Sequence, residues 1–530
     1  MVLTYLNRNK SKCDEAIECY DQTVSLKLRS THYKEIFRKG NALCTQKKYY
    51  EAIECYDQVI SWNPKYQNAH FNKGSALNAI KNYKEAIECF NHVIVLNPND
   101  FEAHYIKGNA LKSLKKYEEA IECYNQSLVI NPTFSKAYYH KGNALKNLER
   151  NKDAIECYNQ AIQHNPTHLH SYHNKGLALE SLKKYDEAIE CCNQVLSLNP
   201  NYYKAYHNKG YAYHVLKMYK EAIECYDKGI SLYPEYRHSY FNKGIALYTL
   251  KKYKEAIECY DRLILFDSNS YEAYYNKGNA LKSLKRFSEA VECYQIVVIL
   301  NNEHYKAYYN SGNAYSELQK YKEAIDCYSK AISINKMHFK SHQNKGLAFR
   351  ALKRYDESIK CYDECISINK NYYKVYGNKG NTLFRIKRFK EAIECFDKAI
   401  LIHPGYQDAH FKKGAVLTIL ENYQEAVECF NRAIAINPGD YEAYYFKGNA
   451  LTALSKYNDA LECYNSAIKI KPTYIKSYFN KSNLLKNLGR HEEANQCFEE
   501  GQCLSQSNPN NPQLGVESLL FDDNDVFVHK

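Results

Sequence analysis

The sequence predicts an all-α protein built as a stack of antiparallel helix pairs, and two observations carry that prediction. Glycine recurs thirteen times at a spacing of 34 residues, from Gly40 to Gly448, and Ser482 takes the next position. Between successive glycines, apolar residues recur at steps of three and four, as they do on one face of a helix. Unrelated domains would not repeat in this way, so one array accounts for most of the 530 residues.

Composition excludes two broad classes of protein. The chain is 45% hydrophobic and 25% charged, which is too apolar for a disordered chain. Its mean hydropathy of −0.64 is too polar for a membrane protein. No apolar run approaches the ~18 residues of a transmembrane helix, and the polar first residues do not form a signal peptide. We therefore expect no membrane insertion.

Each repeat contains two predicted helices. When the repeat begins at Tyr33, 14 repeats cover residues 33–508, and positions within a repeat are numbered here as places one to 34. In the fourth repeat, Tyr138, Gly142 and Leu145 follow helical spacing, and a second helical stripe begins at Ala154. The two or three polar residues between the stripes allow an antiparallel hairpin.

Three columns indicate how the helices pack and end. Glycine at place eight lies inside a helix, where it costs roughly 1 kcal/mol relative to alanine, so its repetition predicts close contact with a second helix. Alanine at place 20, interrupted only by Ser358, fits the same contact. Proline at place 32 of nine repeats ends the second helix. Repeats seven to ten lack this proline, and there we predict looser connections or extended second helices. They carry Ser268, Asn302, Lys336 and Lys370 at that place.

These columns resemble the tetratricopeptide repeat. That family has a 34-residue helix-turn-helix unit with an aromatic residue at place four, Gly at eight, Ala at 20, Tyr or Phe at 24 and Pro at 32, and the resemblance covers about nine tenths of the chain. Place seven departs from the family, because it is Lys in 13 repeats where Leu is usual; a Lys stem can pack while its head reaches water. The resemblance implies a right-handed superhelical solenoid whose inner wall is formed by the first helices.

The predicted organisation has three regions. Residues 1–32 form a partial repeat or cap, residues 33–508 the array of 14 repeats, and residues 509–530 a flexible tail. Residues 14–22 copy the second helix of a repeat. The acidic and apolar residues 519–523 are either part of an inert tail or a docking peptide.

Cysteine occupies place 23 of all 14 repeats. Equivalent residues of stacked helices lie about 8–10 Å apart, which exceeds the ~7 Å limit between the Cα atoms of a disulfide. We therefore interpret the column as small apolar filler. Twenty cysteines that cannot pair along their column indicate a reducing compartment and predict a cytoplasmic protein, with ciliary or nuclear pools left open.

Nucleic-acid binding, metal binding and catalysis are not predicted. Basic residues crowd the end of the first helix and place 19 is acidic in every repeat, an alternation that the helix dipoles favour. A nucleic-acid groove would need Arg and aromatic residues along one surface. No phosphate loop, Ser-His-Asp set or HExxH motif occurs, so we expect neither an enzyme nor a cofactor. Four histidines at one turn lack Cys or carboxylate partners for a metal; they are His164, His168, His170 and His173.

The candidate binding site lies on the inner wall that the resemblance implies, at places two, five, six, nine, twelve and thirteen. Place six is Asn in seven consecutive repeats, and an Asn amide offers two donors and an acceptor. Such a row can bind the N–H and C=O groups of an extended polypeptide whatever its sequence. It resembles the asparagine ladder in the superhelical arm of O-linked N-acetylglucosamine transferases. The predicted peptide-binding residues are Asn174, Asn208, Asn242, Asn276, Asn310, Asn344 and Asn378.

Neighbouring columns bear on this site in two ways. Aromatic residues at place five, such as Tyr275 and Tyr309, and Asn at place nine, such as Asn279 and Asn313, are expected to add side-chain selectivity. Asn at place six is also frequent in the family generally, so the row is either used or merely inherited.

The favoured prediction is a non-enzymatic protein–protein interaction scaffold that binds extended polypeptide segments in the concave groove. Two alternatives stay open: the targeting arm of a transferase whose catalytic domain is missing or separate, and a structural spacer in a large assembly such as ciliary transport or cell-cycle machinery. Chaperone C-terminal tails are disfavoured as partners. The members of the family that clamp them need Lys or Arg at place five, and none of the 14 repeats has one.

Overall fold

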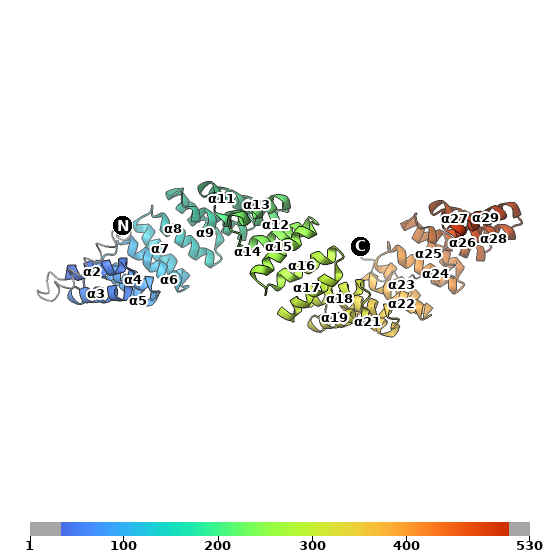
Figure 1. Ribbon diagram of the computed structural model, residues 1–530, viewed down its shortest axis with the longest axis horizontal. Coiled ribbons are helices and arrows are strands. Elements are labelled where there is room, and N and C mark those ends of the chain that lie inside the picture. Colours follow the sequence, from blue (N-terminus) through green and yellow to red (C-terminus); the bar gives the residue numbers. More distant parts are fainter. Residues whose placement is uncertain (1–32, 508–530) are drawn as a thin grey trace. The chain divides into compact units, whose positions relative to one another are not determined.

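The all-α prediction is confirmed. The structure is a computed structural model, and it describes residues 33–507. These residues form 28 helices, α2 to α29, paired as consecutive antiparallel hairpins (Figure 1). The predicted partial repeat at residues 1–32, the predicted tail at 509–530 and its candidate docking peptide lie outside the described residues. None of the helices in the described part of the chain is long and apolar enough to cross a membrane.

The helices alternate regularly in length. The first helices, each of 13 residues, are α2 (Tyr33–Thr45), α4 (Gln67–Ala79), α6 (Phe101–Ser113), α8 (Ser135–Asn147), α10 (Leu169–Ser181), α12 (Tyr203–Val215), α14 (Arg237–Thr249), α16 (Tyr271–Ser283), α18 (Tyr305–Glu317), α20 (Phe339–Ala351), α22 (Tyr373–Arg385), α24 (Gln407–Ile419), α26 (Tyr441–Ala453) and α28 (Ile475–Asn487). The second helices are α3 (Tyr49–Trp62), α5 (Tyr83–Leu96), α7 (Tyr117–Ile130), α9 (Asn151–His164), α11 (Tyr185–Leu198), α13 (Tyr219–Leu232), α15 (Tyr253–Phe266), α17 (Phe287–Leu300), α19 (Tyr321–Ile334), α21 (Tyr355–Ile368), α23 (Phe389–Ile402), α25 (Tyr423–Ile436), α27 (Tyr457–Ile470) and α29 (His491–Ser507).

The described chain divides into two compact bodies. The N-terminal body ends at Lys252 and contains α2 to α14, and the C-terminal body begins at Tyr253 and contains α15 to α29. Within each body, first helices of successive repeats contact each other, whereas second helices of successive repeats do not among the residues described. The first helices therefore stack more tightly and form the inner wall of each body, as the resemblance implies.

The predicted close contact at place eight is confirmed. In the fourth repeat, a Cβ atom added to Gly142 would lie 2.7 Å from the Cε1 atom of Tyr158, the residue at place 24. Tyr158 and Ala154 are both fully buried. The same contact recurs in other repeats, for example between Gly312 and a buried tyrosine ring. Glycine is kept inside these helices because the aromatic ring of the second helix occupies the space of a side chain.

The turn inside each hairpin has a left-handed backbone conformation that its residue types do not predict. The residue at place 15 has a left-handed φ near +60° in repeat after repeat, for example Glu149 at 60° and Lys183 at 60°. In the fourth repeat, the N–H of Arg150 then donates to the carbonyl of Leu145 at 2.9 Å, which closes the C-terminus of α8. A non-glycine residue in this conformation costs about 1 kcal/mol. Only the last such turn of the described residues has glycine there, Gly489.

The predicted extension of second helices in repeats seven to ten is wrong. The four helices α15, α17, α19 and α21 have 14 residues each, the same length as second helices followed by proline. An Asn or Asp at place 31 ends them: its side-chain oxygen accepts the N–H group two residues later, as Asn369 does from Asn371 at 3.2 Å. Asp267, Asn301 and Asn335 do the same in the other three repeats. The same Asx turn also follows second helices that carry the proline, as at Asn97 and Asn131, so the turn does not depend on proline.

Candidate functional site

All seven predicted asparagines lie on first helices, which form the inner walls. Three are in the N-terminal body, on α10, α12 and α14, and four are in the C-terminal body, on α16, α18, α20 and α22. Their surroundings differ, however, and the difference divides the row into two groups.

In the first group, the asparagine is bound within the array. At the junction of repeats four and five, Oδ1 of Asn143 at place nine accepts two hydrogen bonds. One comes from the hydroxyl of Tyr158 at 2.8 Å and the other from Nδ2 of Asn174 at 2.7 Å. Nδ2 of Asn174 also donates to the hydroxyl of Tyr139 at 3.2 Å. We call this arrangement, an Asn at place nine that accepts from a Tyr at place 24 and from the next Asn at place six, the amide junction.

Two more of the predicted residues belong to amide junctions in the C-terminal body. Nδ2 of Asn310 donates to Asn279 at 3.0 Å, and Nδ2 of Asn344 donates to Asn313 at 2.8 Å. Both asparagines are buried, and Lys282 donates to Oδ1 of Asn310 at 3.1 Å. The place-nine asparagines, which we expected to add selectivity for a peptide, therefore bind the row itself. The place-five residues Tyr275 and Tyr309 also accept hydrogen bonds from it.

In the second group, the amide is free. These four side chains are half-buried and make no side-chain hydrogen bond within residues 33–507. Each follows a repeat whose place nine is not Asn, so the acceptor of an amide junction is missing. The free amides are Asn208, Asn242, Asn276 and Asn378, and the residues at place nine of the preceding repeats are Leu177, Tyr211, Ile245 and Leu347.

Lysines at place twelve extend the polar surface of the N-terminal body. Lys112 is half-buried on α6, and its Nζ donates to Nδ1 of His140 on α8 at 2.8 Å. Burial, together with the positive charges of nearby lysines, lowers the pKa of His140 to about 3, so this imidazole is neutral and accepts the hydrogen bond. Burial also lowers the pKa of Lys112 and of Lys146, the equivalent residue one repeat later. Place twelve thus lies over the junctions between first helices.

The next residue of this column is an acid. Burial raises the pKa of Glu180 to about 7, and its Oε1 atom is buried with no hydrogen-bond donor among the described residues. The hydroxyl of Tyr226, whose charge interaction with Glu180 indicates proximity, is also buried and unpartnered in the described part of the chain. Repeat six carries Tyr211 at place nine, so Tyr226 lacks the asparagine acceptor that serves Tyr158.

Replacing Glu180 with glutamine should stabilise the N-terminal body at high pH. The folded-state pKa of Glu180 is raised above its ordinary 4.5, so the folded state holds the proton to higher pH than the unfolded chain. The free energy of unfolding therefore falls as pH rises from about 4.5 to about 7. Glu180→Gln should remove that fall and add about 1–3 kcal/mol at pH 8, but little at pH 4. Urea unfolding at both pH values measures this; the same gain from the exposed Glu118→Gln would contradict it.

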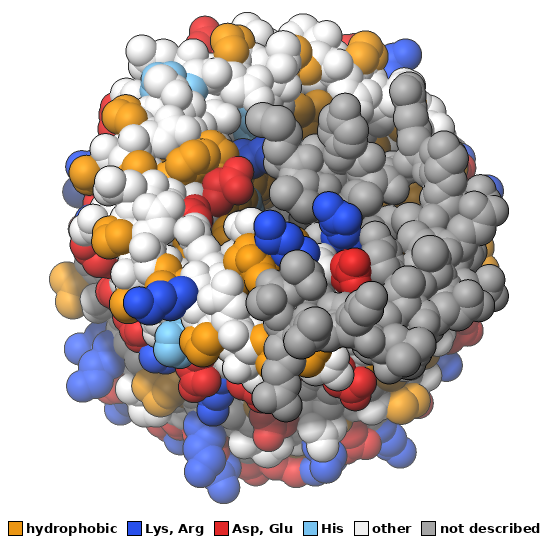
Figure 2. All heavy atoms as spheres, turned by 90° about the vertical axis from the view of Figure 1, so that its left-hand side faces the viewer, with side chains coloured by type: hydrophobic (Ala, Val, Ile, Leu, Met, Phe, Trp, Pro, Cys, Tyr) orange, Lys and Arg blue, Asp and Glu red, His pale blue; other side chains and the backbone are white. Residues whose placement is uncertain are grey.

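Away from the inner wall, many charged side chains form ion pairs. Lys243 at place seven pairs with Asp227 of the preceding second helix at 2.6 Å, and Arg388 pairs with Glu391 at 2.6 Å. On the end face seen in Figure 2, basic and acidic side chains are interspersed.

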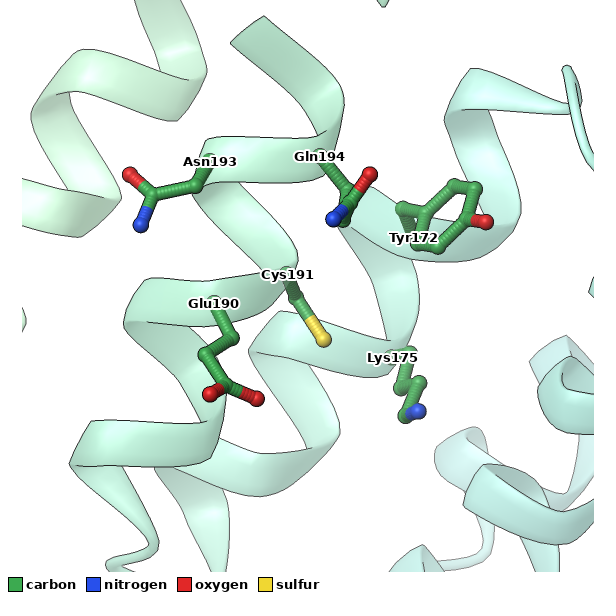
Figure 3. Close-up of a pocket in the computed structure, with 6 residues that line it drawn as sticks. All are labelled: Tyr172, Lys175, Glu190, Cys191, Asn193 and Gln194. Atoms are coloured by element: carbon green, nitrogen blue, oxygen red, sulfur yellow. The ribbon is translucent and has the colours of Figure 1, made fainter. Parts of the chain in front are cut away.

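A cavity of about 330 Å³ lies between α10 and α11 (Figure 3). Its lining includes Tyr172 and Lys175, which α10 directs away from the face that carries Asn174, and the thiol of Cys191. Burial raises the pKa of Cys191 to about 11, so the thiol is protonated near neutral pH and is a poor nucleophile. The cavity therefore does not hold an activated cysteine nucleophile.

The other sequence-predicted clusters are structural in character. The 18 cysteines of the described residues are all free thiols, and most are buried. The four histidines near the turn of repeats four and five do not converge, and no group of His, Cys, Asp or Glu among the described residues could hold a metal. Instead, His164 stacks on Tyr138, and His168 lies 2.7 Å from the hydroxyl of Ser171.

Stacked helical hairpins with one inner wall of first helices define a helical-repeat solenoid protein. Family models for the tetratricopeptide repeat match most of the chain, and the chain belongs to the tetratricopeptide repeat family. Proteins of this family generally act as protein-interaction scaffolds. One model, described as tetratricopeptide repeat, matches residues 68–100, 101–134, 135–168, 171–202, 203–236, 271–304, 305–338, 339–372, 373–406 and 408–440. A model described as TPR repeat matches 40–80, 244–285 and 448–489, and a further tetratricopeptide repeat model matches 475–507.

Several solved structures are similar to parts of the chain. YrrB, described as a TPR protein with an unusual peptide-binding site, is 26% identical; the match covers 35% of this chain and 96% of that protein, with a TM-score of 0.33. A fragment of MamA from Desulfovibrio magneticus RS-1 is 24% identical over 33% of this chain and 97% of its own, with a TM-score of 0.31. The C-terminal part of a repeat protein from Cytophaga hutchinsonii is 21% identical over 45% and 98%, with a TM-score of 0.41. A search of curated protein sequences found no match.

Proposed function

We propose that this protein is a non-enzymatic scaffold that binds extended polypeptide segments along its inner walls, and that the free amides of the asparagine row hold the polypeptide backbone. The observation that carries this proposal is the division of the row. Asn208 and Asn242 belong to consecutive repeats of the N-terminal body, are half-buried, and have no partner within the described residues. A half-buried amide with unmade hydrogen bonds is costly unless water or a ligand satisfies it.

The spacing of the repeats suits an extended chain. Packed helices lie about 8–10 Å apart, and an extended chain advances about 3.3 Å per residue. One repeat therefore spans about three residues, and each free amide can bind the N–H or C=O group of every third residue. Because backbone groups are the same in every sequence, this contact supplies affinity rather than selectivity. In the C-terminal body, Asn276 and Asn378 are separated by the bound Asn310 and Asn344, so Asn208 and Asn242 are the two consecutive free amides of the described row that lie within a single body.

Replacing both Asn208 and Asn242 with alanine should weaken peptide binding about tenfold or more, since each lost amide contact is worth about 0.5–1.5 kcal/mol. The probe is a set of amidated peptides selected on the full chain from a random 15-residue phage library, with affinity measured by fluorescence polarisation. Asn72→Ala is the matched control, because its amide already donates to Asn41 at 2.7 Å and lies outside the proposed stretch. Equal affinity for the double variant and the control would contradict the proposal.

A further inference from the structure

We propose that the inner wall of repeats three and four selects polypeptide segments with two acidic side chains about three residues apart, bound by Lys112 and Lys146. This inference rests on the proposed function, because it names which segments the groove takes. It concerns side-chain recognition at place twelve, two to four repeats before the free amides of Asn208 and Asn242.

Lys112 is a cation without a counter-ion. Its ammonium group is half-buried, and the one hydrogen bond it makes is to the neutral imidazole of His140 at 2.8 Å. An ammonium has three donors, so two remain for a ligand. No carboxylate lies within ion-pair distance of Lys112 in the described residues, and Glu102, the acid at place two of the same repeat, is exposed.

Lys146 repeats this situation one helix further along. It is half-buried on α8, its side chain makes no hydrogen bond or ion pair within the described residues, and burial lowers its pKa. Burial lowers the pKa of the neighbouring His173 to about 4, and the positive charges of Lys146 and Lys204 contribute to that shift. The carboxyl group of Glu180 lies at the equivalent place one helix further along, but Lys146 forms no ion pair with it. Helices α6 and α8 contact each other and lie side by side in Figure 1. The two lysines therefore occupy equivalent places on neighbouring helices of one wall.

Elsewhere the chain gives comparable lysines a partner. Lys73 pairs with Asp57 at 2.5 Å, and the buried Lys412 of the C-terminal body pairs with Asp408 at 3.0 Å. Lys282, at place twelve of repeat eight, donates to the amide oxygen of Asn310 at 3.1 Å. A half-buried ammonium without a carboxylate loses hydration and receives no Coulomb compensation. At Lys112 and Lys146, a carboxylate from a bound segment would supply the missing opposite charge. It would also replace the lost water contacts with charge-assisted hydrogen bonds.

The geometry sets the pattern of the segment. The helix spacing of about 8–10 Å corresponds to about three residues of extended chain, so the two acids should occur at positions i and i+3. The carboxyl of Glu180, which follows in the same column, ends the cationic stretch after two repeats.

The test selects peptides from a random 15-residue library that is displayed internally, so that no free carboxyl terminus contributes. The full chain, a Lys112→Gln/Lys146→Gln variant and a Lys84→Gln/Lys152→Gln control are compared. Lys84 and Lys152 are exposed near the starts of second helices, so the control removes equal charge from another surface. We expect acid pairs at i and i+3 to be enriched on the full chain and the control, and this enrichment to be lost on the first variant. The affinity of an enriched peptide should fall about tenfold or more.

Three results would overturn the inference. The proposed selectivity would be contradicted if the enriched peptides lack an acid pair, or if an acid pair is still enriched after both lysines are replaced. The scaffold proposal would stand in that case, provided that Asn208→Ala/Asn242→Ala still weakens binding. No enrichment of any peptide on the full chain would contradict the scaffold proposal as well. Displacement of an enriched peptide by a single-stranded oligonucleotide, with the same dependence on Lys112 and Lys146, would assign the site to phosphates instead. Thermal melts verify that each variant is folded.

Discussion

Gly142→Ala should destabilise the fourth repeat by about 1–3 kcal/mol, whereas Gly176→Ala should leave the fifth repeat as stable or make it up to about 1 kcal/mol more stable. The added Cβ at Gly142 would lie 2.7 Å from Cε1 and 2.9 Å from Cδ1 of the buried Tyr158 ring. At Gly176, the nearest atom is the Cβ of Cys191 at 3.4 Å, because place 24 of that repeat is Cys192 and not an aromatic residue. Alanine has a higher helix propensity than glycine at both positions. The aromatic ring alone therefore decides whether the substitution raises or lowers the free energy of unfolding.

Hydrogen exchange measured on both variants can locate the effect. In a repeat array each unit depends on its neighbours, so Gly142→Ala should accelerate exchange in α8 and α9 first. The variant Gly142→Ala/Tyr158→Cys copies the fifth repeat and serves as the control for the ring clash. If Gly142→Ala leaves hydrogen exchange in α8 and α9 unchanged, then the Tyr158 ring does not exclude a side chain at place eight. The explanation of the glycine column would then be wrong.

The fold was predictable from the sequence because one period repeats through the chain. The 34-residue spacing, the helical stripes and the Gly and Ala columns all describe local contacts that recur, so each repeat confirms the others. The structure differs from the prediction where different residue types can produce the same local structure. Proline at place 32 is not required to end a second helix, because Asn369 and its equivalents follow helices of the same length without it and accept an N–H two residues later. The left-handed turn at Lys183 has no sequence signal, because glycine, its usual residue, is absent there.

The site was predictable only in part, for a related reason. The asparagine row is visible in the sequence, and all seven residues lie on the inner-wall helices. Whether an amide is free depends on a contact across two repeats, which a single column does not reveal. The sequence does hold that signal: Asn174 follows Asn143 at place nine and is bound, whereas Asn208 follows Leu177 and is free. The signal appears only when place six is read together with place nine of the repeat before it.

Asn143→Leu is the second large effect, and we expect it to destabilise the junction of repeats four and five by about 2–4 kcal/mol. The substitution removes the acceptor of two hydrogen bonds, from the fully buried Tyr158 and from Asn174. Burial raises the pKa of the Tyr158 hydroxyl, so it stays protonated and needs an acceptor. A buried donor left without a partner costs about 1–3 kcal/mol. Urea unfolding of the full chain, with hydrogen exchange in α8 to α10, measures the loss.

The triple variant Asn143→Leu/Tyr158→Phe/Asn174→Leu separates hydrogen bonding from packing. Replacing donors and acceptor together by apolar groups of similar shape is nearly neutral, so most of the stability lost in Asn143→Leu should return. The coupling among the three sites should be about 0.5–3 kcal/mol. Such coupling would mean that Asn174 is held by the array and that only the free amides can hold a polypeptide. If Asn143→Leu costs nothing while Asn174→Ala abolishes peptide binding, the division of the row fails and every asparagine in it returns as a candidate ligand contact.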